Sequence, residues 1–323
     1  MKICVYGAGA IGSHVALRLA IGGADVSVVA RGAQLAAIQS DGIRAETVGG
    51  TLTARVRASD DPATLGPQDA VLVTVKAPAL PAIAAAIAPL LGPDTPVAFV
   101  MNGIPWWYCH GLDGPLADMQ LPLVDPDGAA WRAIGPHRAV GGVVYSACTV
   151  IAPGIVRVVT KNDRIILGKP DGSPSPRAEA IAAMLRAGGM GCEVTPRIRD
   201  AIWTKLALNI GTGPLAALTH SPMKLFLADP TVEAAMRALL AEAIAIAHGV
   251  GCKIAPDVNA IVEAVRHSSH KPSILQDLEL GRPMEIDAIY MVPLAFAEMT
   301  GVPAPTLRLL TALLRLQARA AGL

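Results

Sequence analysis

The chain has 323 residues, of which 52% are hydrophobic and 16% charged, so it is long and apolar enough for two ordinary domains with packed cores or for one large domain. A formal net charge of +1 gives no electrostatic reason to expect nucleic acid or an anionic membrane as a partner. The most apolar runs, such as residues 79–91, are too short or contain proline, which argues against a membrane span. A glycine-rich turn beginning at Gly7 leaves no room for a signal peptide, and we expect a cytoplasmic protein.

Neither metal chemistry nor hydrolase chemistry is indicated. The five cysteines are odd in number and scattered without CxxC spacing, which is typical of reduced, buried thiols. His267 and His270 lack a carboxylate partner at HExxH spacing, so we interpret them as solvated residues at a helix end and expect no metal. A nucleophilic serine in a GxSxG elbow is absent as well.

The first motif follows a predicted buried strand at residues 2–6 and precedes a predicted helix. Its residues are Gly7, Ala8, Gly9, Ala10, Ile11 and Gly12. In a strand–GxGxxG–helix unit the first glycine permits the tight turn, the second lets the backbone approach a pyrophosphate, and the third allows close helix–strand packing. This context favours dinucleotide binding at the helix N-terminus over a plain glycine-rich turn.

The second predicted strand, residues 25–30, ends where an NAD enzyme carries an acidic residue for the ribose 2′-hydroxyl. Here the chain reads Ala30-Arg31-Gly32. A missing carboxylate with an arginine in its place favours a 2′-phosphate and therefore NADP. The alternative is that Arg31 is an ordinary surface charge.

Two further predicted strands of the parallel-sheet type, residues 70–75 and 94–101, end in Lys76 and in Asn102-Gly103. Open α/β sheets bind ligands at the carboxyl ends of their strands, so Lys76 and Asn102 are placed to meet a cofactor or substrate. Asn-Gly is also a strong turn dipeptide, which is the structural alternative for that pair. Residues 51–58 alternate like an exposed strand or hairpin arm.

Three of the eleven aromatic residues are consecutive at residues 106–108. We consider two interpretations of Trp106-Trp107-Tyr108, a helix start with a ring packed inward or an aromatic wall over the nicotinamide pocket. Further on, residues 141–150 and 154–167 read as strands joined by a turn at Pro153-Gly154, and we expect them to extend the sheet.

Residues 171–176 are dense in turn formers and mark the predicted start of the hinge. We therefore predict an α/β Rossmann-type N-terminal domain over residues 1–170 and an all-α C-terminal domain over residues 177–323. After a short strand near Cys192, helical patterning dominates the second half. The predicted helices cover residues 177–188, 200–218, 230–249, 256–267, 284–300 and 304–320, with another starting near residue 273.

Lys205 and Asn209 stand four residues apart in the helix predicted at 200–218, so both point the same way. Their neighbours, among them Ile202 and Leu206, are apolar. A lysine in such a place can extend its head to water, or it can serve as a proton donor whose pKa burial lowers. The residues around it do not decide between the two.

Taken together, the motifs resemble the ketopantoate reductase family. The matching stretches, in the family's order, are GAGAIG at 7–12, Arg31, VKA at 75–77, NG at 102–103, KLALN at 205–209 and SILQDLELGRPMEID at 273–287. The resemblance implies a Rossmann domain, an all-helical domain and a site in the cleft between them. It also implies NADPH as cofactor and a small 2-oxo acid as substrate. A helical second domain also offers surfaces for a homodimer, although the sequence does not determine the oligomeric state.

Residue by residue, the resemblance assigns Lys205 as the general acid and places Asn102 between NADPH and substrate. Asn209 and Ser273 would hold the substrate, and Glu285 would lie against the cofactor or the substrate hydroxyl. Ala147 corresponds to a cofactor-contacting alanine. An ammonium can polarise the carbonyl of a 2-oxo acid and protonate the alkoxide that hydride addition creates.

The chain departs from the family on the substrate side. The family's asparagine eight residues after the lysine is Gly213 here, its glutamine before Asn-Gly is Met101, and a later NG is replaced around residues 221–223. Three functions are therefore considered. The first is reduction of 2-dehydropantoate (ketopantoate) to pantoate, on the route to pantothenate and coenzyme A. The second is reduction of another 2-oxo acid by a paralogue, and the third is NADPH sensing without catalysis.

Overall fold

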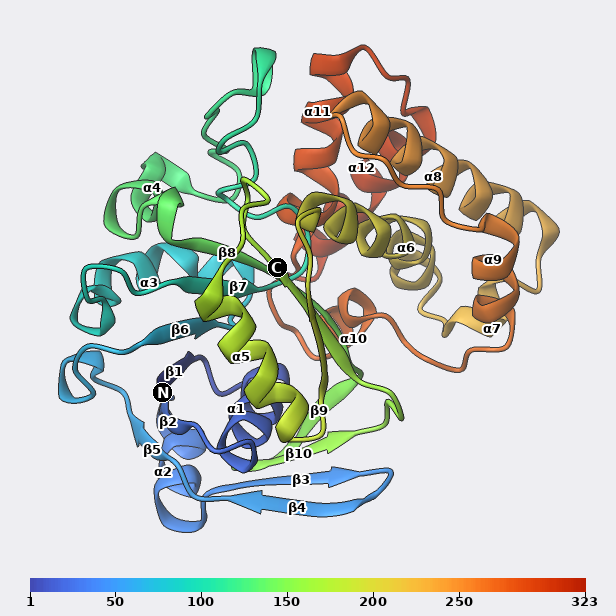
Figure 1. Cartoon of the computed structure of the whole chain (residues 1–323). Helices are drawn as coiled ribbons and strands as arrows, with labels where there is room; N and C mark the ends of the chain where they lie inside the picture. Colours follow the sequence, from blue (N-terminus) through green and yellow to red (C-terminus); the bar gives the residue numbers. More distant parts are fainter. The chain divides into compact units, whose positions relative to one another are not determined.

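The structure is a computed structural model that describes residues 1–323. The chain folds into two compact units. Unit 1 comprises Met1–Met101 and Pro105–Ile198, and unit 2 comprises Asn102–Ile104 and Arg199–Leu323 (Figure 1). The predicted fold class, a Rossmann-type α/β domain followed by an all-α domain, is confirmed.

Unit 1 is built on an eight-stranded sheet with the order β12-β11-β8-β7-β6-β1-β2-β5, in which only the β8–β11 pair is antiparallel. Its strands are β1 (Lys2–Tyr6), β2 (Asp25–Val29), β5 (Arg57–Ser59), β6 (Ala70–Val73), β7 (Val97–Val100), β8 (Ala139–Tyr145), β11 (Arg164–Gly168) and β12 (Gly191–Val194). The central strands β1 and β6 are almost fully buried, as continuous apolar runs in a sheet covered on both faces require.

The helices of unit 1 lie on opposite faces of this sheet. They are α1 (Ala10–Ile21), α2 (Gly32–Asp41), α3 (Leu80–Ala86), α4 (Ala129–Ala133) and α5 (Pro176–Ala187). From β1 the chain crosses through α1 toward β2, whereas from β6 it crosses through α3 toward β7 in the other direction. Right-handed crossovers then put α1 and α3 on opposite faces. The strand order therefore reverses between β1 and β6, and such a switch point is where open α/β sheets bind ligands.

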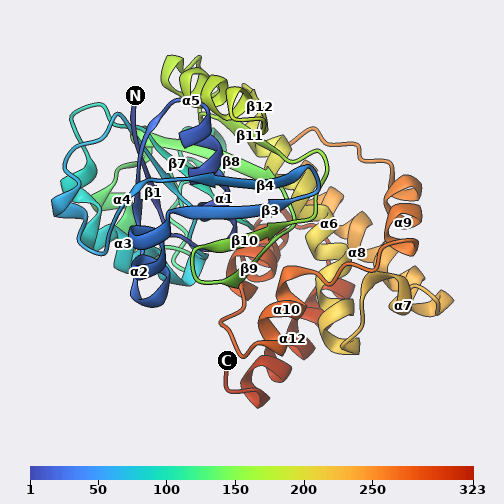
Figure 2. The ribbon, with the colours of Figure 1, turned by 90° about the horizontal axis from the view of Figure 1, so that it is seen from below.

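A second, four-stranded sheet with the order β4-β3-β10-β9 corrects one expectation. Its strands are β3 (Ile43–Thr47), β4 (Gly50–Ala54), β9 (Cys148–Ala152) and β10 (Ile155–Val158), which lie side by side in Figure 2. The turn at Pro153-Gly154 forms as predicted, but its two arms pair with the β3–β4 hairpin rather than extending the main sheet. Of residues 141–167, only β8 and β11 join the main sheet.

The aromatic run at residues 106–108 belongs to the core of unit 1. Trp106, Trp107 and Tyr108 are at most 1% exposed, and Trp106 makes edge-to-face contacts with Phe99 and Trp131 at centroid distances of 5.5 and 6.1 Å. The segment forms turns, so the helix start, one of the two interpretations considered, is not found, although its inward-packed rings are. Full burial explains these rings as packing, which removes the reason to assign them to a ligand wall.

The boundary between the units falls later than the segment 171–176 suggested. Strand β12 pairs with β11, and α5 packs beside α1, so both belong to unit 1 (Figure 1). Ser175 caps α5 by accepting a hydrogen bond from the backbone N–H of Ala178. The turn formers at 171–176 therefore mark a loop and a helix start inside unit 1.

Unit 2 is helical apart from its loops. Its elements are α6 (Ile198–Thr219, whose first residue groups with unit 1), α7 (Met223–Phe226), α8 (Pro230–Gly249), α9 (Val258–Arg266), α10 (Ser273–Glu279), the π-helix η7 (Asp287–Met291), α11 (Val292–Thr300) and α12 (Pro305–Ala320). These bounds agree with the predicted helices to within a few residues, except that the first turns of the helix predicted at 284–300 are a π-helix. No helix of the chain combines the length and apolar character needed to cross a bilayer.

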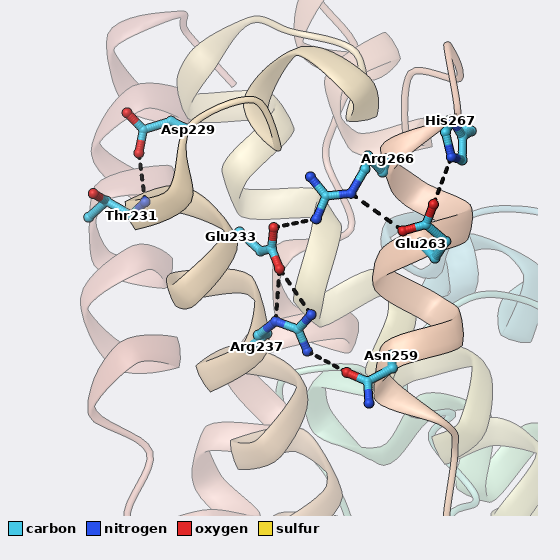
Figure 3. A network of polar contacts seen from close by, with 8 residues as sticks. All are labelled: Asp229, Thr231, Glu233, Arg237, Asn259, Glu263, Arg266 and His267. Carbon is cyan, nitrogen blue, oxygen red and sulfur yellow. Dashed lines mark hydrogen bonds and ion pairs between the residues drawn. The ribbon is translucent and has the colours of Figure 1, made fainter.

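Polar contacts join α8 to α9 at the surface of unit 2 (Figure 3). Glu233 on α8 pairs with Arg237 on its own helix and with Arg266 on α9. The imidazole of His267 contacts Glu263 at 2.8 Å, and its side chain is 75% exposed. Water screens ion pairs as exposed as these, so they contribute little to stability. His267 is therefore a solvated helix-end residue, as predicted.

Gly213 on α6 allows the close approach of Tyr290. An ideal Cβ on Gly213 would overlap the hydroxyl oxygen of Tyr290 and would lie 3.4 Å from Cζ of the same tyrosine. It would also lie 3.2 Å from Cγ2 of Ile274. Tyr290 is fully buried and belongs to the π-helix η7, a rare turn type that is frequent at functional sites. Because Gly213 has no side chain, the phenol of Tyr290, from another part of unit 2, can pack directly against it.

This contact yields a prediction about stability. Gly213→Ala should lower the free energy of unfolding by about 1–3 kcal/mol, because the new methyl group must displace the Tyr290 hydroxyl. In a Tyr290→Phe background the oxygen is gone, and the same substitution should be neutral or slightly stabilising, since alanine favours a helix by about 1 kcal/mol over glycine. Urea denaturation of the four proteins measures both values. Equal costs of Gly213→Ala in the two backgrounds would contradict the contact.

Candidate active site

The glycine-rich turn of unit 1 lies at the switch point of the sheet. Gly7 follows β1 with φ +108°, a conformation that favours glycine. The hydroxyl of Thr74, which follows β6, donates hydrogen bonds to the carbonyl oxygens of Gly7 at 2.7 Å and Tyr6 at 3.3 Å. The neighbouring strand therefore fixes the path of the turn.

The other two glycines of the motif differ in their surroundings. A Cβ on Gly12 would overlap the carbonyl oxygen of Gly7 and the hydroxyl of Thr74, so this glycine is required for packing. A Cβ on Gly9 would meet nothing within 4 Å. Gly9 is also the N-cap of α1, which has no side-chain cap and no acidic residue in its first turn. The N-terminus of α1 is thus uncapped by side chains and has open space beside Gly9, which suits an anion.

Three of the other residues predicted for the cofactor, Arg31, Lys76 and Ala147, also belong to unit 1. Arg31 is exposed, two residues past the end of β2, where it is the N-cap of α2. Burial raises the pKa of Tyr6, and the guanidinium of Arg31 offsets part of that effect. Lys76 is partly buried and follows β6, and Ala147 lies between β8 and β9, where its N–H donates to Thr160 at 2.6 Å.

Unit 2 brings together a lysine, an amide and a carboxylate that lie far apart in the sequence. The ammonium of Lys205 donates to Oδ1 of Asn102 at 2.8 Å, and Nδ2 of Asn102 donates to the carboxylate of Glu285 at 3.3 Å. Glu285 is only 5% exposed. The amide of Asn102 therefore receives a hydrogen bond from the cation and donates one to the anion, which fixes the orientation of both.

Burial lowers the pKa of Lys205 from 10.5 to about 8, because an ammonium loses hydration among apolar residues, and the negative charge of Glu285 offsets part of this shift. Buried neighbours on α6 include Trp203 and Leu206. A pKa near 8 leaves the amine largely protonated at neutral pH yet able to release its proton. Such tuning is typical of catalytic groups.

Gly103 holds Asn102 in place. Its φ is +76°, and a Cβ there would lie 2.6 Å from the carbonyl carbon of Ala288 in η7. The next residue, Ile104, donates its N–H to the carbonyl oxygen of Ala288 at 2.8 Å. Asn102-Gly103 is therefore more than a turn signal, because the glycine lets the segment pack against the helix that follows Glu285.

Asn209 and Ser273 belong to the same unit as this cluster. Asn209 is partly buried, one helical turn beyond Lys205 on α6, and Ser273 is the exposed first residue of α10. Sequence reasoning missed Tyr290, whose hydroxyl lies over Gly213, another turn along α6. Gly213 was the one residue in the sequence that pointed to it, because a missing side chain on the Lys205 face of α6 leaves a space that another residue can fill.

Comparisons with known proteins agree with this arrangement. Residues 3–172 match the ketopantoate reductase PanE/ApbA family, and residues 197–318 match its C-terminal domain. The 2-dehydropantoate 2-reductase of Mesorhizobium japonicum is 43% identical over 98% of this chain and 97% of its own length. The solved 2-dehydropantoate 2-reductase of Geobacter metallireducens is 30% identical, covers 98% of this chain and 99% of its own, and superposes with a TM-score of 0.86.

A second solved structure, provisionally assigned as a ketopantoate reductase of Ralstonia solanacearum, is 42% identical with a TM-score of 0.92, and the match covers 99% of this chain and 98% of the other. Both halves of the chain, the glycine-rich turn and the lysine-bearing helix, thus fall within matched regions. The chain belongs to the ketopantoate reductase family of oxidoreductases.

Proposed function

We propose that the protein reduces 2-dehydropantoate to pantoate with NADPH, on the route to pantothenate and coenzyme A. The observation that carries this proposal is the Lys205–Asn102–Glu285 cluster, in which a partly buried ammonium has a pKa near 8. The full-length similarity to 2-dehydropantoate 2-reductases supports the choice of substrate.

The glycine-rich turn of unit 1 fits the pyrophosphate of a dinucleotide. The open space over Gly9 and the uncapped start of α1 leave room and backbone donors for two phosphates. Arg31 would hold the 2′-phosphate, and Lys76, Ala147, Asn102 and Glu285 are further candidate contacts. When bound, NADPH supplies a hydride for C2 of the substrate.

Lys205 supplies the electrostatic and acid chemistry in this proposal. Its ammonium donates a hydrogen bond to the C2 carbonyl oxygen and stabilises the negative charge that grows there as C2 gains hydride. The proton then passes from Nζ to that oxygen, the N–H bond breaks, and a 2-hydroxy acid and a neutral amine result. Asn102 keeps Nζ in position, and Glu285 favours reprotonation because its charge raises the pKa of the amine.

Asn209 and Ser273 are the proposed holders of the substrate's carboxylate and oxygen groups. A related 2-oxo acid is the second candidate substrate, and Gly213 in place of the family's asparagine is the observation that favours it. A panel of 2-oxo acids assayed with NADPH separates these two possibilities. Tight NADPH binding without turnover of any member would instead indicate a sensor.

Replacement of the lysine tests its role directly. Lys205→Met should lower kcat by about 100-fold or more, because the alkoxide loses both its electrostatic partner and its proton source. The Kd for NADPH should change by less than about threefold. Lys224→Met removes an exposed lysine of α7 and should leave both constants unaltered. An unchanged kcat in Lys205→Met would refute the assignment.

The pH dependence follows from the lowered pKa. Reduction needs the protonated amine, so kcat/KM should be level below pH 8 and should fall about tenfold per pH unit above it. In Glu285→Gln the inflection should move to lower pH, because the carboxylate raises the pKa of Lys205. Steady-state rates between pH 6 and 10 provide the profile. An inflection near 10.5 would mean that the catalytic acid is not a buried lysine.

Cofactor choice is tested at Arg31. Arg31→Ala should reduce the preference for NADPH over NADH about tenfold, because a charge-assisted hydrogen bond contributes roughly 1.5–3 kcal/mol. Arg44→Ala, which removes another exposed arginine of unit 1, should leave the ratio of the two kcat/KM values unchanged. If Arg31→Ala also leaves that ratio unchanged, the 2′-phosphate assignment is wrong.

A further inference from the structure

One face of α6 carries polar groups at two of three successive turns. Lys205, Asn209 and Gly213 are spaced four residues apart, so they follow one another along the same side of the helix. The third position has no side chain of its own. Tyr290 occupies it instead, with its hydroxyl oxygen where a Cβ on Gly213 would lie. The third polar group on this face is therefore the hydroxyl of Tyr290, which η7 contributes.

That hydroxyl is fully buried and has no hydrogen-bond partner within the protein. A buried unpaired hydroxyl costs free energy that phenylalanine at the same place would not. Thr311 on α12 also carries a buried hydroxyl without a partner, so this property alone does not mark a binding site. Tyr290 differs because its oxygen lies on the face that bears Lys205 and Asn209.

The charge near Tyr290 limits which ligand group could pair with it. Burial raises the pKa of the phenol, and the carboxylate of Glu285 raises it further, so the hydroxyl stays protonated and neutral. It can donate one hydrogen bond and accept another. A second carboxylate beside Glu285 would be repelled, whereas a neutral hydroxyl would not.

We propose that Tyr290 selects the substrate by hydrogen-bonding a hydroxyl group on the side chain of the 2-oxo acid. This inference rests on the proposed reduction of a 2-oxo acid and specifies its substrate class as hydroxylated. When such an acid binds, its hydroxyl group supplies the hydrogen-bond partner that the buried phenol lacks. An otherwise identical acid without the hydroxyl leaves the phenol unpaired and binds less well.

The test compares two acids on two enzymes. The acids are 2-dehydropantoate and 3,3-dimethyl-2-oxobutanoate, which differs only by lacking the side-chain hydroxyl. Wild type should prefer the hydroxylated acid at least about tenfold in kcat/KM, the ratio expected for one hydrogen bond. In Tyr290→Phe this preference should shrink about tenfold through weaker use of the hydroxylated acid, while the constant for its analogue stays unchanged.

A binding measurement adds a readout that does not depend on turnover. Pantoate should raise the melting temperature of wild type more than its deoxy analogue does, and Tyr290→Phe should abolish the difference. Thr311→Val removes a buried unpaired hydroxyl from the same unit and should alter neither the kinetic ratio nor this difference. Melting of the free proteins checks that each variant is folded.

The outcomes separate the two proposals. If wild type reduces neither acid with NADPH, the proposed function fails, and the assignment of Tyr290 fails with it. If both acids are reduced but Tyr290→Phe leaves their ratio unchanged, only the assignment of Tyr290 is overturned. A ratio that shrinks equally in Thr311→Val would also overturn it, since the effect would then be structural.

Discussion

The cluster of Lys205, Asn102 and Glu285 is the interaction on which the chemistry proposed for this chain depends. Burying an ammonium is costly, and that cost lowers the pKa of Lys205 to about 8. The carboxylate of Glu285 offsets only part of the cost, and the amide of Asn102 links the two charges. If nearby negative charge offset the whole desolvation cost, the lysine would hold its proton too firmly to donate it. If nothing offset that cost, the lysine would lose its proton below neutral pH.

Several features of unit 2 that look unrelated in the sequence serve this cluster. Gly103 lets residues 102–104 pack against Ala288, and the following N–H of Ile104 is bonded to the same residue. The π-helix that carries Ala288 also carries Tyr290, so one irregular turn supports the asparagine and fills the space over Gly213. Small residues at 103 and 213 thus allow side chains from distant segments to meet at α6.

Much of the fold could be predicted from local pattern. Buried parallel strands, the glycine-rich turn and long amphipathic helices each leave a signal within one element, and the structure has them at the expected residues. The partners of a strand leave no such signal, which is why the β9–β10 hairpin was expected in the main sheet. The domain boundary was placed early for a similar reason, because turn formers at 171–176 do not reveal that α5 and β12 return to the sheet.

The candidate site divides in the same way. Lys205, Asn102 and Glu285 could be named because each lies in a distinctive motif, and the structure brings those three together. Tyr290 could not, because its position over Gly213 depends on the register of a π-helix, and an extra residue in a helical turn changes which side chains face inward. The glycine at position 213 indicated that the family's asparagine is missing from this face of α6, but it did not indicate which residue takes its place.

The pKa of the Lys205 amine, measured by NMR on protein with isotope-labelled lysine, tests the central claim most directly. We predict a value of about 8 for this one amine, and a lower value in Glu285→Gln because the carboxylate raises it. Lys205→Arg identifies the resonance by its loss. A Lys205 amine that titrates near 10.5, unaffected by Glu285→Gln, would contradict both the buried cluster and the role of this lysine as the acid.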